Sequence, residues 1–143
     1  MSDVCEGMNE AEERRMFMEF AIELLLCMGL ELRKMQLIAF ILEKGYGVGT
    51  DYGWRFFFDG SHSEKFASGV MVAVGFGLVE IEGEDTPYGY KQLKYRLTDK
   101  GVKMLERVLE RVAMPAEVLG YVRTLSSMNT KELLEIARKY EKV

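Results

Sequence analysis

The residues of this sequence that could do chemistry are one histidine, two cysteines and an isolated pair of glutamates. His62 lies between Ser61 and Ser63, and it is the only base available to a serine or cysteine nucleophile. Neighbours on one segment rarely align as nucleophile and base, and a zinc site needs several Cys and His ligands close together. Cys5 and Cys27 are far apart, so no disulfide is expected. We therefore expect a protein that is not an enzyme and has no metal or cofactor.

Glu19 and Glu23 interrupt an otherwise apolar run in a helix expected over residues 10–28. They are four residues apart and so share one helix face. We interpret them as lying at a solvent edge or pairing across an interface, in preference to an acid–base couple. A helix that is apolar on most sides must be covered on most sides. We predict a homodimer formed through this helix, with burial inside one chain as the alternative; the dimerisation residues would be Phe17, Phe20, Leu24, Leu25 and Met28.

The elements that position these residues are organised around residues 77–101. A strand starts at Leu78, and residues 83–89, with their Gly, Asp and Pro, predict a turn. Residues 93–97 return with apolar side chains at alternate positions, which is typical of a half-buried strand. Thr98 is then a plausible helix N-cap. Helix, strand, long turn, strand and helix is the pattern of the wing in a winged-helix protein.

Helices account for most of the remaining sequence. The pattern predicts an aromatic strand at residues 54–58 and helices at 32–44, 61–74, 98–113, 115–125 and 130–142. Ser63 is an alternative N-cap for the helix at 61–74. Leu37, Ile38, Ile41 and Leu42 form an apolar stripe in the first of these helices, and Asn129 with Glu132 resembles a capping box at the start of the last. By its order, the helix ending at residue 74 is the recognition helix. The expected fold class is mostly α with a small antiparallel β wing (α+β): a winged helix-turn-helix with an extra N-terminal helix and two extra C-terminal helices.

Length and composition favour a single globular domain over residues 1–143. Residues 1–30 would serve dimerisation, residues 31–101 would form the winged-helix core, and residues 102–143 would supply the C-terminal helices. We expect residues 1–9 to be loose. No secretory signal is visible, and the apolar run is too short and polar to span a bilayer, so we expect a cytoplasmic protein with no membrane contact.

Four segments, QLIAFILEKGYG, WRFFFDGSHS, VGFGLVEI and YRLTDKG, follow one another in the central part of the chain. Together, over residues 37–105, they resemble the YwgA-like and Panacea-type domains, small winged-helix proteins that include bacterial antitoxins. Those families carry Gly-Pro-Tyr-Ser where this sequence has Gly60-Ser61-His62-Ser63. The last segment is also similar to MarR-like and PadR-like regulators. The resemblance implies a regulatory or partner-binding role and no established chemistry.

DNA binding is the commonest use of a winged helix, and it requires donors for bases and cations for phosphate. The net charge of −4 and the acidic residues 80–85 oppose it. A dimer would double a modest set of cations, so we expect a dimeric transcription regulator that binds double-stranded DNA. The alternative is a winged-helix protein–protein interaction module without DNA binding. The candidate DNA-binding residues are Arg55, His62, Lys65, Ser68, Lys91, Lys94 and Arg96.

Overall fold

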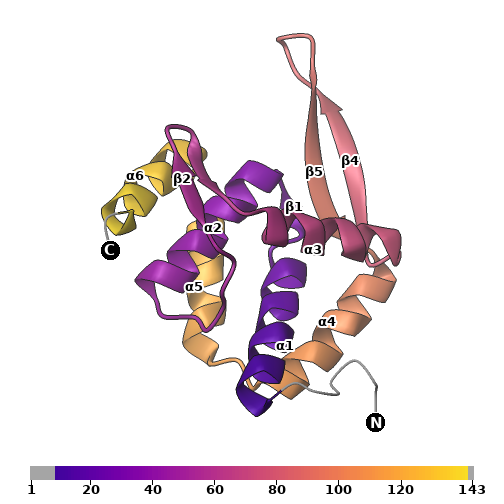
Figure 1. The fold of residues 1–143 in the computed structure, drawn as a ribbon. Helices are drawn as coiled ribbons and strands as arrows, with labels where there is room; N and C mark the ends of the chain where they lie inside the picture. Colours follow the sequence, from indigo (N-terminus) through magenta and orange to yellow (C-terminus); the bar gives the residue numbers. More distant parts are fainter. Residues whose placement is uncertain (1–8, 142–143) are drawn as a thin grey trace.

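The computed structural model describes residues 9–141, which form a mostly helical α+β fold, as predicted (Figure 1). Residues 1–8 and Lys142, which belong to predicted segments, lie outside the described residues. Within that range no helix is both long enough and apolar enough to cross a membrane. The elements of residues 9–141 are α1 (Glu10–Leu25), β1 (Met28–Leu30), α2 (Leu32–Gly45), β2 (Arg55–Phe57), β3 (Gly60–His62), α3 (Glu64–Gly75), β4 (Val79–Asp85), β5 (Lys91–Leu97), α4 (Asp99–Val112), α5 (Ala116–Ser126) and α6 (Thr130–Tyr140).

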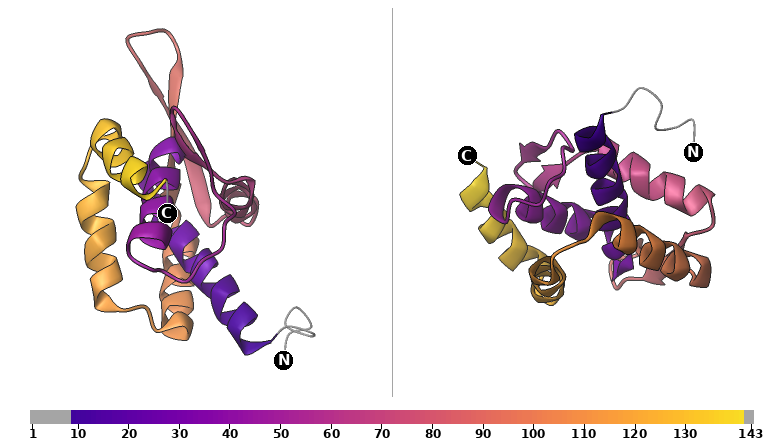
Figure 2. Two further views of the ribbon diagram at one scale, coloured as in Figure 1. Left: turned by 60° about the vertical axis from the view of Figure 1, so that its left-hand side comes forward. Right: turned by 90° about the horizontal axis from the view of Figure 1, so that it is seen from below.

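Helix α2 lies at the centre of the core, and every residue from 35 to 42 is buried. Helices α5 and α6 pack on α2 on the side of the molecule away from α3, while α1 packs against both α3 and α4 (Figures 1 and 2). The predicted caps hold. Thr98 begins α4 by accepting from the backbone N–H of Gly101, and Asn129 with Glu132 forms a capping box at α6.

An antiparallel sheet with the strand order β1-β5-β4 forms the second part of the fold. The β4–β5 hairpin projects away from the helices (Figures 1 and 2). The prediction that the chain turns from residue 83 is wrong, because Gly83 pairs with Leu93 and the ladder continues to the pair of Asp85 and Lys91. The backbone N–H of Thr86 then bonds to the oxygen of Tyr90 and closes a shorter turn.

Strand β1 was not predicted. The helix expected to reach residue 28 ends at Leu25, and Met28 pairs with Arg96 of β5. Gly29 has a φ of +88°, a left-handed conformation that glycine adopts without strain and that redirects the chain here. The backbone N–H of Leu97 donates to the oxygen of Cys27 at 3.0 Å, which ties the end of α1 to the sheet.

The aromatic strand expected at residues 54–58 is confirmed as β2, but it pairs with a second strand, β3, where a helix start was an option. Of the two predicted starts of α3, the one with Ser63 as the cap is confirmed, and the helix begins at Glu64. Ser63 is its N-cap, and its hydroxyl oxygen accepts from the backbone N–H of Phe66 at 3.1 Å. The β2–β3 hairpin therefore fixes the position at which α3 starts.

Candidate functional site

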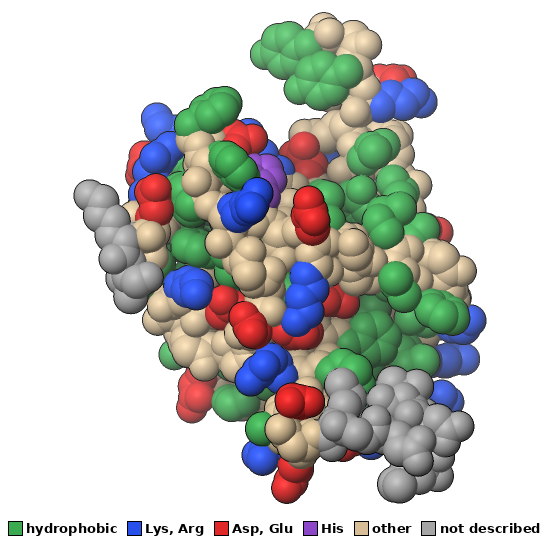
Figure 3. Space-filling view, viewed as in Figure 1, with side chains coloured by type: hydrophobic (Ala, Val, Ile, Leu, Met, Phe, Trp, Pro, Cys, Tyr) green, Lys and Arg blue, Asp and Glu red, His purple; other side chains and the backbone are tan. Residues whose placement is uncertain are grey.

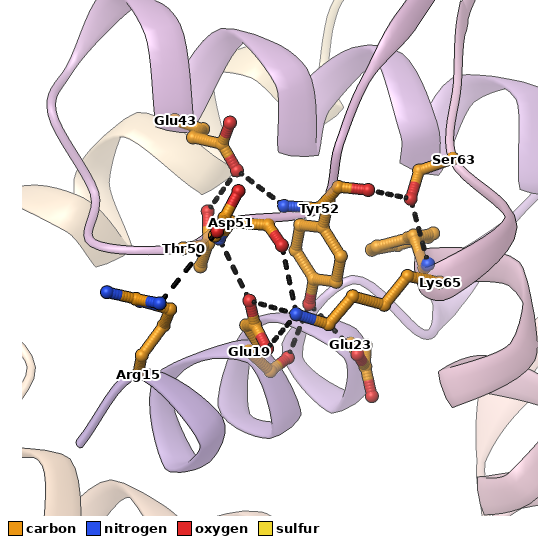
Figure 4. A network of polar contacts seen from close by, with 10 residues as sticks. Arg15, Glu19, Glu23, Glu43, Thr50, Asp51, Tyr52, Ser63 and Lys65 are labelled. Carbon is orange, nitrogen blue, oxygen red and sulfur yellow. Dashed lines mark hydrogen bonds and ion pairs between the residues drawn. The ribbon is translucent and has the colours of Figure 1, made fainter. Parts of the chain in front are cut away.

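A buried polar network centred on Tyr52 joins α1, α2, α3 and the loop of residues 46–54 (Figure 4). Tyr52 is 3% exposed. Its hydroxyl group donates to Oε2 of Glu23 at 2.9 Å and lies 2.8 Å from the backbone oxygen of Glu19. Two turns of α1 are thus held against the loop by one side chain.

Glu19 is bound on both carboxylate oxygens. The Nζ of Lys65 lies 2.9 Å from Oε1 and 3.0 Å from Oε2, and the backbone N–H of Asp51 donates to Oε2 at 2.8 Å. Lys65 also donates to the backbone oxygen of Asp51 at 2.9 Å. The prediction that Glu19 and Glu23 lie at a solvent edge or an interface is wrong, because both are buried and face the chain's own loop and α3.

Among the residues that the structure describes, the Glu23 carboxyl group has no partner like the Lys65 ammonium group and the Asp51 N–H that bind Glu19. Within residues 9–141, Tyr52 is the only hydrogen-bond partner of its carboxyl group and no cation pairs with it. Burial is the main reason that the pKa of Glu23 is raised to about 7. The hydrogen bond from Tyr52 lowers this pKa, the charge of Glu19 raises it, and the charge of Lys65 lowers it. The backbone of Gly69 in α3 lies so close that a Cβ there would overlap the Glu23 carboxyl group.

Further contacts fix the loop around Tyr52. Glu43 of α2 accepts from the hydroxyl of Thr50 at 2.7 Å and from the backbone N–H of Tyr52 at 3.3 Å. The hydroxyl of Ser63 donates to the backbone oxygen of Tyr52 at 2.7 Å. These contacts tie the loop to α2 and to the start of α3.

Cys27, two residues after the end of α1, is a free, buried thiol whose Sγ donates to the backbone oxygen of Glu23 at 3.2 Å. Burial, together with the nearby Glu23, raises its pKa to about 12. A thiol with so high a pKa is a poor nucleophile. Cys5 lies outside the described residues.

A pocket of about 290 Å³ opens beside the two carboxyl groups, and all of its lining comes from α1. Its walls are Met16, Phe17 and Phe20, and its polar lining is Glu19 and Glu23. The pocket therefore combines an apolar surface with one compensated and one uncompensated carboxyl group.

Three of the predicted DNA-binding residues, Arg55, His62 and Lys65, line one pocket of about 360 Å³ at the start of α3. His62 bonds through Nε2 to Asp59 at 3.1 Å, and this bond lowers the pKa of Asp59. The ammonium group of Lys65 turns toward Glu19. Ser68 is exposed one turn further along the helix.

The other three predicted DNA-binding residues lie on β5, and each is paired with a carboxylate of β4. The charged atoms lie 3.9 Å apart for Lys91 and Asp85. Lys94 and Glu84 are 3.1 Å apart, and the nitrogen Nε of Arg96 is 3.2 Å from the Glu82 carboxylate. The hairpin therefore neutralises its own cations within the chain.

The five predicted dimerisation residues differ in how far they are exposed. Leu24 is fully buried in the core of the single chain, so it is not on a surface open to a second copy. Phe17, Phe20 and Leu25 are half-buried, and the Arg111 guanidinium of α4 lies 4.6 Å from the ring centroid of Phe17. Met28 is exposed on β1. Much of the apolar surface of α1 is thus covered by α3 and α4.

The exposed face of α3 is polar in its first half, with Glu64, Lys65 and Ser68, and apolar towards its C-terminal end. Phe66 and Val70 are buried, whereas Met71 is 49% exposed. Val72 is 56% exposed, and Phe76, the C-cap residue, is 66% exposed. Hydrophobic side chains gather over this part of α3 and along the β4–β5 hairpin (Figure 3). On the hairpin they include Ile81 and Leu93.

No protein-family model, curated protein or solved structure matches this sequence. Within residues 9–141, no group of three or more His, Cys, Asp or Glu side chains is placed to hold a metal ion. Sequence reasoning missed Tyr52, Glu43 and Gly69. The signal available was the isolation of Glu19 and Glu23 in an apolar run, since buried carboxylates require partners.

Proposed function

We propose that the chain is a winged-helix protein-binding module. In this assignment α2 and α3 form the helix pair, α3 occupies the recognition-helix position, and the β4–β5 hairpin is the wing. The order β1-β5-β4 supports the assignment, because the short strand before α2 pairs with the returning strand of the hairpin.

The observation that carries the proposal is the exposed apolar face of α3, formed by Met71, Val72 and Phe76. A helix that reads bases in the major groove needs hydrogen-bond donors and acceptors on that face. Apolar side chains in this position instead gain by being buried against another apolar surface, at about 25 cal/mol per Å². A protein partner with apolar anchors supplies such a surface.

The charges of the hairpin support the same function. Lys91, Lys94 and Arg96 each lie beside a carboxylate of β4, so phosphate contact would require these pairs to break. Affinity for nucleic acid depends on cations that are free to replace counterions on phosphate. The net charge of −4 adds a general repulsion.

DNA binding is kept as a second candidate because of the pocket that Arg55, His62 and Lys65 share at the first turn of α3. A helix N-terminus with cations beside it is a favourable place for a phosphate group. This set is small, and Lys65 is already engaged by Glu19. It supports, at most, weak and salt-sensitive contact with a DNA backbone.

A catalytic role finds little support around the single histidine. The hydroxyl of Ser61 donates to the backbone oxygen of Gln36 at 3.0 Å, and the hydroxyl of Ser63 donates to that of Tyr52 at 2.7 Å. Both flanking serines are thus held by backbone oxygens, and His62 contacts Asp59.

Homodimerisation is retained as a proposal. Met28 supports it as the most exposed of the five predicted contact residues. Light scattering at low micromolar concentration tests it: a dimeric mass is expected, and a monomeric mass would end the proposal.

Two measurements on the full chain test the binding function. The first is fluorescence anisotropy with a random duplex at about 50 mM salt, a condition that favours electrostatic binding. We expect no association. Salt-sensitive association that Arg55→Ala weakens equally for all duplex sequences would overturn the proposal in favour of DNA.

The second measurement is site-specific cross-linking in an extract of the source cells, with a photoreactive phenylalanine analogue in place of Val72. We expect a discrete protein adduct that Phe76→Ser abolishes, because that change removes an apolar anchor from the same face. The same analogue at Glu135, an exposed position on α6, is the matched control. Adducts that are equal at the two positions, or insensitive to Phe76→Ser, would count against a binding face on α3.

A further inference from the structure

The pocket along α1 has an electrostatic asymmetry that protein binding through α3 does not explain. Glu19 and Glu23 both line it, and both are at least nine-tenths buried. Lys65 and a backbone N–H neutralise Glu19, whereas the carboxyl group of Glu23 receives only the Tyr52 hydroxyl within residues 9–141. A buried carboxylate without a cation is costly and normally acquires a partner.

We propose that this pocket binds an organic cation, an ammonium group carried on an apolar chain, with the ammonium at Glu23 and the chain against Met16, Phe17 and Phe20. Because Glu23 is 8% exposed, water screens the attraction between the ammonium and its carboxylate less than it would at the surface. The ring of Phe20, on the same pocket wall, adds cation–π attraction when the ammonium lies over its face. A volume of about 290 Å³ lies at the lower end of ligand pockets, which favours a small ligand.

The position of α3 supports a site built around this carboxyl group. Gly69 is the residue of α3 that lies against Glu23, and any side chain there would occupy the space of the carboxyl group. Glycine in a helix interior is unfavourable by about 1 kcal/mol relative to alanine. At this position it lets the carboxyl group stay between the two helices, at the edge of the pocket.

The protonation state of Glu23 sets the expected pH dependence of binding. With a pKa of about 7, its carboxyl group is mostly neutral at pH 6 and mostly ionised at pH 8. The charged or titratable groups that face it are Glu19 on α1, Tyr52 on the loop and Lys65 on α3, and Arg111 of α4 lies over Phe17 on the pocket wall. An alkylammonium ion stays charged throughout this range, so its affinity should rise about tenfold from pH 6 to pH 8.

The test is an NMR titration of the full chain with n-hexylamine and with its neutral analogue n-hexanol at pH 8. We expect saturable shifts at Gly69 and Phe20 with the amine, with a dissociation constant on the order of 1–10 mM for so small a ligand. The alcohol should bind at least about tenfold more weakly. Glu23→Gln should reduce the affinity for the amine to that for the alcohol, and Glu64→Gln, an exposed control on α3, should change neither.

Equal affinity for the amine and the alcohol, or no saturation with the amine, would overturn the proposal. So would amine binding that Glu23→Gln leaves unchanged. Met16→Trp provides an independent variant, because it fills the apolar part of the pocket and leaves Glu23 in place. It should abolish binding of both probes while the amide spectrum elsewhere in the chain is preserved, and retained binding would place the amine outside this pocket.

Discussion

The ionisation of Glu23 should make the protein less stable as the pH rises. Folding raises the pKa of this carboxyl group from its ordinary value of 4.5 to about 7, so the folded chain holds the proton more tightly than the unfolded chain. The resulting destabilisation develops between pH 4.5 and pH 7 and is complete above pH 7. At about 1.4 kcal/mol for each tenfold change in proton affinity, it amounts to about 3 kcal/mol at pH 8 and below about 1 kcal/mol at pH 5.

Glu23→Gln removes this cost and keeps an oxygen that accepts from Tyr52. Relative to the unchanged chain, its free energy of unfolding should therefore increase by about 2–3 kcal/mol more at pH 8 than at pH 5. Urea unfolding at the two pH values measures this difference directly. Glu135→Gln, at an exposed position, is the control and should show no such dependence. If Glu23→Gln shows the same stability difference at both pH values, the folded carboxyl group titrates normally and the reasoning fails.

Three further substitutions test the packing of the network by urea or thermal unfolding. Gly69→Ala should destabilise the chain by about 1–3 kcal/mol, because its Cβ would overlap the Glu23 carboxyl group. The control Gly120→Ala, at an open helical position, should stabilise it by up to about 1 kcal/mol. Equal effects of the two substitutions would contradict the close contact between Gly69 and Glu23. Lys65→Met should cost about 2 kcal/mol because it leaves the buried Glu19 without its cation, and Lys103→Met, at an exposed position, should cost almost nothing. Tyr52→Phe should cost about 1–2 kcal/mol through loss of the hydroxyl that contacts both glutamates, and no loss beyond that of the exposed control Tyr88→Phe would refute the role assigned to this hydrogen bond.

Local sequence signals predicted the elements whose causes are local. The capping residues Thr98 and Asn129 located the starts of α4 and α6, and the apolar stripe of α2 located the central helix. Strand β1 could not be found in this way, because its partner Arg96 lies far along the chain from Met28. Three residues show no usable periodicity, and only the pairing with β5 makes them a strand.

The ion pairs of the β4–β5 hairpin were missed because the predicted turn was displaced. A turn over residues 83–89 places its centre before Pro87, but the observed pairing of Asp85 with Lys91 places it at Tyr88. The register of a hairpin follows from its turn. With the observed register, the alternating carboxylates of β4 lie on the same face as Lys94 and Arg96, so cations expected to be free for phosphate are engaged within the chain.

Lys65 links the fold to the choice between the two functions. It is the only cation of α3, and its ammonium group lies within 3.0 Å of the Glu19 carboxylate and the Asp51 backbone oxygen. Moving it to a DNA phosphate would leave Glu19 buried with a single backbone donor, at a cost of about 2 kcal/mol that opposes the phosphate contact. The exposed side chains of Met71 and Val72 do not neutralise a buried charge. The part of α3 that is free to contact a partner is therefore its apolar part, and the charged part is needed to hold α3 against α1.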